Sequence, residues 1–219
     1  MGKEERVFAR KVNPAILGLA AGITESLGRV TAGRNGTHAF LSLTPNTSSR
    51  DHGSAPAVAM LVDPTAVQTK SEVRQVEAAA VKLGQEVRIF NVRSDADINA
   101  AFATMVDQKI GGLLVQPDQF FTIRRDQLVL LTTRHAMPTV FGWREFVVAG
   151  GLMSYGTSLR AAYRQVATYV GRILKGEKPA DLPVQQATAF ETVVNLKAAN
   201  ALGVTIPTAI LLRADEVIE

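Results

Sequence analysis

The sequence of 219 residues contains no cysteine, one tryptophan and no apolar stretch approaching the roughly 20 residues that a membrane-spanning helix needs. Without cysteine, disulfide bonds, thiolate metal sites and a cysteine nucleophile are all excluded. Charged residues make up 20% of the chain and hydrophobic residues 47%, a balance typical of a folded protein rather than a disordered one. The length suits one large domain or two small ones.

A concentrated basic surface is also missing from most of the chain. The 24 Lys and Arg residues exceed the 20 Asp and Glu residues, for a net charge of +4. Residues 1–53 hold seven basic and four acidic residues, a net charge of +3, so only +1 falls on the remaining 166 residues. Proteins that bind nucleic acids usually gather basic residues on one face. We therefore expect no nucleic-acid partner.

The sequence motifs of common enzymes are absent as well. Leu152 stands where the G-x-S-x-G nucleophile motif would need a glycine before Ser154. No glycine-rich nucleotide-binding motif occurs, and the three histidines, at positions 38, 52 and 135, have no partner at metal-ligand spacing. We therefore expect no catalytic residue, no cofactor and no metal site, and interpret the protein as a non-enzyme.

Residues 1–55 differ in pattern from the rest. Residues 46–54 are polar and rich in turn formers, as in a loop or linker. The apolar residues 15–24 follow several basic ones, as in a secretory signal, but Glu4 and Glu5 interrupt that basic region. A short helix is the other interpretation of this run, so the segment gives no convincing signal peptide.

From residue 57 onward, short apolar runs alternate with helical patterns. Strands are predicted at residues 57–62, 86–92, 111–115 and 138–143. The first helix is expected to start near Ser71, a plausible N-cap, and to end at Gly84, and Asp95 or Asp97 is expected to cap the second helix. A third helix carries Phe121, Leu128 and Leu131. Right-handed crossovers between such units predict an α/β fold with a parallel sheet and helices on both faces.

The pattern changes after Trp143. Residues 150–156 indicate a glycine-flanked strand or crossover, and a long amphipathic helix is predicted from Ser158 to Gly176. A last strand at residues 192–196, a short helix at 197–202 and a terminal helix within 206–219 complete the prediction.

Polar and aromatic side chains follow the predicted strands. In an open parallel sheet, ligands bind beyond the carboxyl ends of the strands. Asp118 and Phe120 follow the third strand, and Trp143 and Glu145 follow the fourth. A carboxylate beside aromatic faces suits an ammonium-bearing organic ligand. Simpler roles stay open, since Phe120 or Phe121 is also a plausible core anchor of the third helix.

Several stretches carry a family resemblance, among them VAMLVDP, GGLLVQPDQFF, GGLMSYGTSLRAAYRQ and VNLKAANALGVTIPTAILLRADEVIE. Residues 56–219 resemble the ABC-transporter substrate-binding proteins of the periplasmic binding protein type I-like class, related to tryptophan- and tyrosine-type uptake proteins. The resemblance implies a Rossmann-like α/β lobe that binds a small-molecule solute and delivers it to an ABC permease in the membrane, and it implies a periplasmic location.

The resemblance also implies particular ligand-binding positions. In relatives that bind aromatic amino acids, an Asp after the third strand, a Glu after the fourth and a later Tyr-Gly lie near the ligand. Gln119 and Phe120 depart from the polar turn of those relatives. The predicted ligand-binding set is Asp118, Gln119, Phe120, Trp143, Glu145, Ser154, Tyr155 and Gly156.

The amino-terminal part departs from the family. Relatives build a whole lobe before the strand at residue 57, whereas 56 residues here provide fewer than two βα units. We expect residues 1–55 to be a divergent remnant of the first lobe, 56–148 a carboxy-terminal-type lobe, and 149–219 a returning helical segment that completes it. The alternative is a truncated homologue that has lost transport function and acts as an interaction or oligomeric protein. The face that the missing lobe leaves exposed is then a candidate surface for a homodimer.

Overall fold

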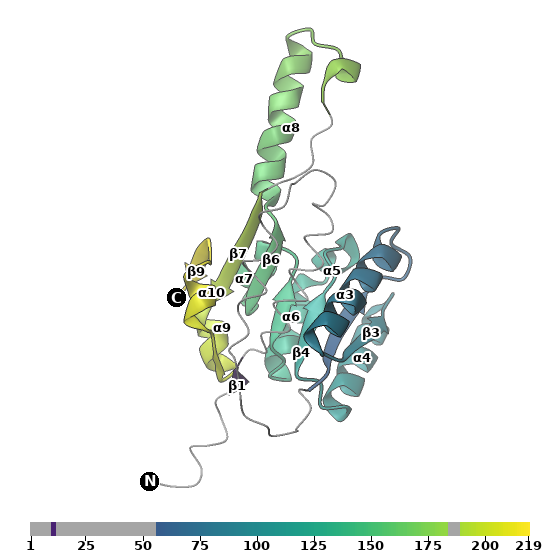
Figure 1. Ribbon diagram of the computed structural model, residues 1–219, viewed down its shortest axis with the longest axis vertical. Helices are drawn as coiled ribbons and strands as arrows, with labels where there is room; N and C mark the ends of the chain where they lie inside the picture. Colours follow the sequence, from purple (N-terminus) through teal and green to yellow (C-terminus); the bar gives the residue numbers. More distant parts are fainter. Residues whose placement is uncertain (1–9, 12–55, 184–188) are drawn as a thin grey trace.

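The computed structural model describes residues 10–11, 56–183 and 189–219, and its centre is a seven-stranded sheet (Figure 1). The strand order is β3-β2-β4-β5-β6-β7-β9, and neighbours are parallel except for β6 and β7. The strands are β2 (Val58–Val62), β3 (Val87–Asn91), β4 (Gly112–Val115), β5 (Thr139–Phe141), β6 (Met153–Thr157), β7 (Phe190–Asn195) and β9 (Glu216–Ile218). β1 (Arg10–Lys11) and β8 (Val204–Thr205) form a separate parallel pair.

Helices lie on both faces of the sheet, as the α/β prediction required. They are α3 (Thr69–Leu83), α4 (Asp95–Asp107), α5 (Gln119–Ile123), α6 (Arg125–Arg134), α7 (Arg144–Val148), α8 (Leu159–Leu174), the 3₁₀ turn η1 (Pro179–Asp181), α9 (Leu196–Ala201) and α10 (Thr208–Leu211). Across the described ranges, none of these helices combines the length and the hydropathy that crossing a bilayer requires.

Side chains alternate between the two faces of the sheet and so build two hydrophobic clusters. Val58, Met60 and Val62 of β2 face one side of the sheet, in the cluster that includes Val76 of α3 and Ile210 of α10. Leu61 faces the other way and packs with Phe102 of α4 and Phe146 of α7. Every residue of β2 is fully buried, which is the burial that its uninterrupted apolar run predicts for a central parallel strand.

The four strands predicted from residue 57 to residue 143 are confirmed as β2 to β5, each one to three residues shorter than predicted. Gly84 ends α3, as predicted, in the left-handed conformation (φ 62°) that glycine adopts without strain. The predicted capping residues were wrong. α3 begins at Thr69, two residues before Ser71, after Gln68. The hydroxyl of Ser94, rather than Asp95 or Asp97, caps α4 by accepting a bond from the amide N–H of Asp97.

The carboxy-terminal third was predicted less completely. The third helix is two helices, α5 and α6, which meet at Arg124. The strand within residues 150–156 is confirmed as β6, and Ser158 caps the long helix α8 as predicted. The terminal helix is only α10, four residues long, and the chain then adds β9 at the sheet edge. The expectations for residues 12–55 lie outside the described residues.

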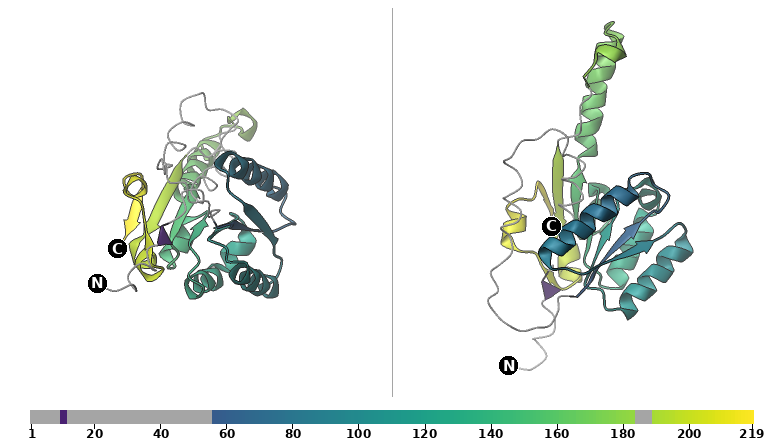
Figure 2. Two further views of the ribbon diagram at one scale, coloured as in Figure 1. Left: turned by 60° about the horizontal axis from the view of Figure 1, so that its bottom comes forward. Right: turned by 45° about the vertical axis from the view of Figure 1, so that its right-hand side comes forward.

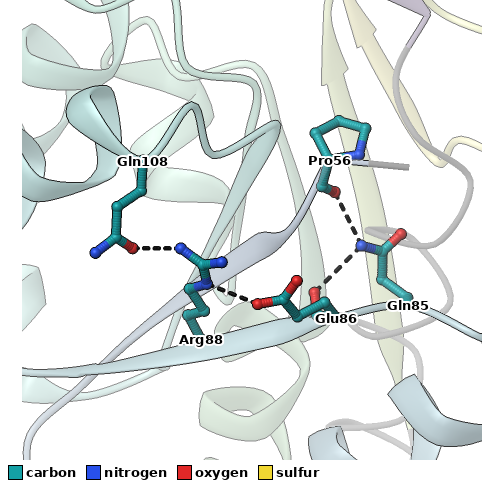
Figure 3. Close-up of polar contacts among 5 residues, drawn as sticks. All are labelled: Pro56, Gln85, Glu86, Arg88 and Gln108. Atoms are coloured by element: carbon teal, nitrogen blue, oxygen red, sulfur yellow. Dashed lines mark hydrogen bonds and ion pairs between the residues drawn. The ribbon is translucent and has the colours of Figure 1, made fainter. Parts of the chain in front are cut away.

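Polar side chains fix the start of β2 at the amino edge of the sheet (Figure 3). The side-chain amide of Gln85 donates to the backbone oxygens of Pro56, at 2.9 Å, and Glu86, at 3.2 Å. Arg88 bonds Glu86 at 2.7 Å and Gln108 at 2.6 Å, which joins β3 to the end of α4. These contacts lie at the opposite end of β2 from the predicted ligand site.

α8 extends away from the sheet beyond the end of β6 (Figures 1 and 2). None of its residues is buried. The stripe predicted as apolar is present, and its side chains lie open, with Tyr163 72%, Val166 56% and Val170 49% exposed. The helix therefore presents an apolar face that nothing in the described residues covers.

Candidate functional site

The segments that follow β2, β4 and β5 lie with the end of β6 at the carboxyl edge of the parallel strands. Gln116, which follows β4, links its own segment to the one that follows β2. Its side-chain oxygen accepts from the backbone N–H of Asp63 after β2, at 2.9 Å. Its amide donates to the hydroxyl of Thr69, at 2.8 Å, and to the carboxylate of Glu72, at 2.7 Å. All the side chains that Gln116 contacts lie in α3, so this network fixes the first turn of α3 against the ends of β2 and β4.

Glu72 is an acidic residue inside the structure, with 2% of its surface exposed. Burial raises its pKa because the charged form loses its hydration, and the nearby Asp118 carboxylate raises it further. The hydrogen bond from Gln116 opposes this rise. The network therefore holds a carboxyl group that favours its neutral form more than a surface Glu does.

Asp118 lies at this edge as predicted, but both of its carboxylate oxygens have partners. One oxygen accepts from the backbone N–H of Phe120, at 2.8 Å, and so caps the amino end of α5. The other accepts from the side chain of Gln68, at 3.3 Å. The residue is half-buried, and part of its hydrogen-bonding capacity serves the fold rather than a ligand.

Gln119 and Phe120 begin α5, and they differ in their surroundings. Gln119 is exposed. The guanidinium carbon of Arg124 lies 4.0 Å from the centre of the Phe120 ring, and Arg124 also pairs with Asp95 at 2.5 Å. Phe121, fully buried, meets Phe120 edge-on at 5.1 Å between ring centres. One face of the Phe120 ring is therefore already taken by a cation of the protein itself.

Trp143 and Glu145 lie where β5 leads into α7. Trp143 precedes the first residue of α7 and packs in part against the cluster that contains Phe141 and Phe146. Those two phenylalanine rings stack at 4.6 Å. Glu145 is half-buried, and one of its carboxylate oxygens, Oε2, is a buried atom without a hydrogen-bond partner among the described residues. Arg144, next to it, is paired with Glu216 of β9 at 2.6 Å.

Ser154, Tyr155 and Gly156 follow one another along β6, so their directions alternate. Tyr155 packs with the cluster that contains Met153 and stacks on Phe190 with 6.2 Å between ring centres. Ser154 is 1% exposed and faces the opposite side of the sheet. The predicted set thus shares one edge of the sheet but divides between its two faces.

Gly156 has a structural reason to be glycine. A Cβ atom placed there would lie 1.9 Å from the backbone oxygen of Gly142, far inside contact distance. Gly142 in turn lies against Pro117, at 2.5 Å from a Cβ built on it. The backbone that follows β4 and β5 is therefore closely packed against the end of β6, and Gly156 serves that packing whether or not it also touches a ligand.

The sequence analysis did not single out Glu72 or Gln116. The buried positions of α3 are Thr69, Glu72, Val76 and Ala80. Since Glu72 precedes Val76 by four residues, the helical spacing placed it on the buried stripe, and this was the signal that could have found it. No comparable signal marked Gln116, because its partners are 44 and 47 residues away in the sequence.

The edge therefore offers carboxylate and hydroxyl acceptors beside aromatic surface. Within the part of the chain that the structure describes, no group of three or more His, Asp or Glu residues is placed to hold a metal ion. Such an arrangement can bind a polar organic molecule by hydrogen bonds and stacking.

Solved structures resemble this fold. A conserved domain protein from Vibrio cholerae O1 biovar El Tor aligns with 74% of this chain and 54% of its own at 25% identity and a TM-score of 0.65. A Streptococcus pneumoniae ABC domain, solved in complex with L-Trp, aligns with 74% of this chain and 56% of its own at 28% identity and a TM-score of 0.66. A Clostridium difficile substrate-binding protein with adhesive properties, in a ligand-free, open structure, shares the fold at 21% identity, with 75% of this chain and 55% of its own aligned and a TM-score of 0.55.

The chain thus spans 54–56% of the length of these solved relatives. No curated protein matches the sequence. The sequence pattern of one protein family matches residues 54–218, which is most of the chain and includes the whole seven-stranded sheet. The chain belongs to the ABC transporter substrate binding protein family.

Proposed function

We propose that this protein is the solute-binding component of an ABC importer and that it binds a small amino-acid-like or aromatic organic molecule without transforming it. The family is one of solute-binding proteins, and a relative at 28% identity was solved with L-Trp. The observation that carries the proposal is the edge of the sheet at β4, β5 and β6, where Asp118, Trp143 and Glu145 follow strands that end side by side.

The proposed role implies one partner beyond the solute, and it implies a location. A membrane permease receives the solute from the protein. The protein therefore works in the periplasm, on the outer side of the cytoplasmic membrane that holds the permease. We also propose a division of the described chain into two parts. Residues 56–148 form one lobe, and residues 149–219 return along it and complete it.

A thermal-shift screen tests this function. The full chain is heated with each of the common amino acids and with aromatic acids and amines, at millimolar concentration. A ligand present at about one hundred times its dissociation constant adds about 2.7 kcal/mol, which corresponds to about 5–10 °C in melting temperature for a chain of this size. A panel in which no solute raises the melting temperature would contradict retained binding.

The alternative function is that of an interaction protein, and the exposed apolar face of α8 favours it. On this view the fold persists, transport is absent, and two copies associate through α8. Sedimentation of the full chain separates the two proposals. A stable dimer whose melting temperature is unchanged by every solute supports the alternative. A monomer that is stabilised by a solute supports the role in solute binding.

A further inference from the structure

The helix α8 projects beyond the sheet (Figures 1 and 2) and carries an apolar stripe that no described residue covers. Tyr163, Val166 and Val170 follow one another on this stripe at helical spacing. The same side continues with Ile173 and Leu174, which are 39% and 82% exposed. Large apolar side chains that gather on a surface mark a place where a protein meets a partner.

The segment that follows α8 leaves this stripe open. The chain turns back after Gly176, and the hydroxyl of Tyr169 donates to the backbone oxygen of Pro183 at 2.6 Å. Tyr169 is half-buried, whereas Tyr163 and Val166 are mostly exposed. The returning segment thus lies along one flank of α8 and does not cover the stripe.

The opposite side of α8 is basic. Arg160, Arg164 and Arg172 lie on it, and α8 contains no acidic residue. Residues 158–183 hold five basic and two acidic residues, whereas residues 54–157 hold ten of each. Among the described residues, an acidic side chain pairs with Arg172 but none pairs with Arg160 or Arg164. Unpaired positive charge therefore accompanies the apolar stripe along the helix.

This charge argues against a second copy of the chain as the occupant of the stripe. Two helices that pack together lie about 8–10 Å apart, which is within the Debye length of about 10 Å at 0.1 M salt. The unpaired arginines of two α8 helices would then repel each other. A partner that is apolar inside and negatively charged at its surface satisfies both sides of α8 at once. An anionic lipid bilayer has this structure, and amphipathic helices with a basic polar face bind to it.

We propose that α8 binds the surface of a membrane that contains anionic phospholipids. The helix lies in the plane of the interface, with the stripe from Tyr163 to Leu174 inserted and with Arg160 and Arg164 at the phosphates. Tyr163 suits this position because its ring is apolar and its hydroxyl stays hydrated. This inference goes beyond solute binding and does not depend on it. Together with the proposed function, it keeps the solute site beside the membrane that holds the permease.

Vesicle flotation of the full chain tests the inference. We expect vesicles of three parts phosphatidylcholine to one part phosphatidylglycerol to bind the protein at least about tenfold more tightly than phosphatidylcholine alone, because each Arg or Lys near an anionic surface contributes about fivefold. Raising the salt from about 0.1 M to about 1 M should weaken this binding, since it shortens the Debye length from about 10 Å to about 3 Å. Equal binding to both kinds of vesicle, or none to either, would overturn the assignment.

Variants then locate the contact on α8. Replacing both Val166 and Val170 by Ser removes apolar area, and we expect it to weaken binding to the anionic vesicles by about fivefold or more. Replacing both Arg160 and Arg164 by Gln removes charge, and we expect a loss of similar size. The second pair serves if the first fails to fold. Full binding by both pairs would place the contact elsewhere and overturn the assignment.

The matched control removes the same charge from another helix. Lys70→Gln combined with Arg74→Gln takes two positive charges from exposed positions of α3 and should leave vesicle binding unchanged. An equal loss of binding in this control would show that net charge, and not α8, attracts the lipid.

The outcomes separate this inference from the proposed function. The α8 variants should keep the wild-type thermal-shift response to solutes, so a failed vesicle experiment leaves solute binding standing. Vesicle binding without any solute response would leave the inference standing and refute the proposed function. Sedimentation without lipid examines the other occupant. A dimer that the Val166 and Val170 replacements dissociate, with no vesicle binding by the wild type, would show that a second copy covers the stripe and would overturn the inference.

Discussion

Glu72 shows how one buried side chain makes stability depend on pH. Its pKa is raised from the ordinary value of 4.5, mainly by burial, so the folded protein holds this proton more tightly than the unfolded chain does. Protonation of Glu72 therefore favours folding, and this contribution is complete below the unfolded value and is lost as pH rises through the folded one. The pKa of Asp63 is lowered from 3.8 by hydrogen bonds from Thr65, and its contribution acts in the opposite direction, only at lower pH.

We predict that Glu72 makes the free energy of unfolding rise as pH falls through its raised pKa toward the ordinary value of 4.5, and that Glu72→Gln removes this contribution because it removes the proton that is taken up. Urea unfolding at a series of pH values measures it. Below about pH 4 the wild type should lose stability again as Asp63 is protonated. A Glu72→Gln variant with the same pH dependence as the wild type would show that another group takes up the proton.

Gly156 gives a second prediction at the level of single residues. Gly156→Ala places a Cβ atom against the backbone oxygen of Gly142, which has no side-chain freedom to move aside, so we expect a loss of about 1–3 kcal/mol in unfolding free energy. Gly171→Ala is the matched control. Gly171 lies within α8, and a Cβ atom built on it would have no neighbouring atom within 4 Å beyond its own helix. Alanine at this position should therefore raise the unfolding free energy by up to about 1 kcal/mol. Chemical denaturation of both variants decides, and equal stabilities would refute the close approach.

Among the elements, the sequence predicted best where burial is uniform. The strands β2 and β4 are buried along their whole length, and an apolar run marks each of them. Helix starts were predicted less well. α3 begins after Gln68, whose side chain makes no capping bond, so the preference for Ser at a cap pointed to Ser71 instead. β9 was missed because it is three residues long, mostly exposed, and defined by its pairing with β7 rather than by its own composition.

α8 is the element whose sequence pattern and surroundings disagree. Its apolar stripe predicts a packed face, yet Val166 and Val170 lie about half exposed. Its opposite face carries Arg160, Arg164 and Arg172, with Arg172 paired to Glu177 at 2.5 Å. A helix of 16 residues, about 24 Å long, thus has an uncovered apolar side and a basic side.

On the alternative function, in which two copies associate through α8, replacing both Val166 and Val170 by Ser lowers that association. On either function we predict that the double variant lowers the melting temperature by no more than about 2 °C, since neither side chain is packed in the described structure. Analytical ultracentrifugation over a range of concentrations measures association. The control is Val76→Ser in α3, a fully buried position, which should lower the melting temperature strongly. If the double variant melts as early as Val76→Ser, the α8 stripe is packed rather than exposed.

At the scale of the whole molecule, the sequence pattern gave the fold class and the family but not the arrangement of the strands. The order β3-β2-β4-β5-β6-β7-β9 places β2, the first strand of the sheet along the chain, in its interior, and β7 runs antiparallel to β6. Such pairings depend on contacts between distant segments, as in the 44 residues that separate Glu72 from Gln116. For the same reason, the sequence predicted only part of the candidate site. Strand ends are visible in a sequence, but which face a side chain takes and which oxygen is already bonded are not.

Trp143 allows a direct test of the claim that a solute binds at this edge of the sheet. It is the only tryptophan of the chain, and it lies between β5 and α7, two residues before Glu145. Selective excitation of its indole, with amino acids and amines that do not themselves fluoresce at that wavelength, reports on its surroundings alone. The account predicts a saturable change in Trp143 emission that follows the affinity measured by calorimetry and is weakened in Glu145→Gln. Solute binding seen by calorimetry with no change in Trp143 emission would contradict it.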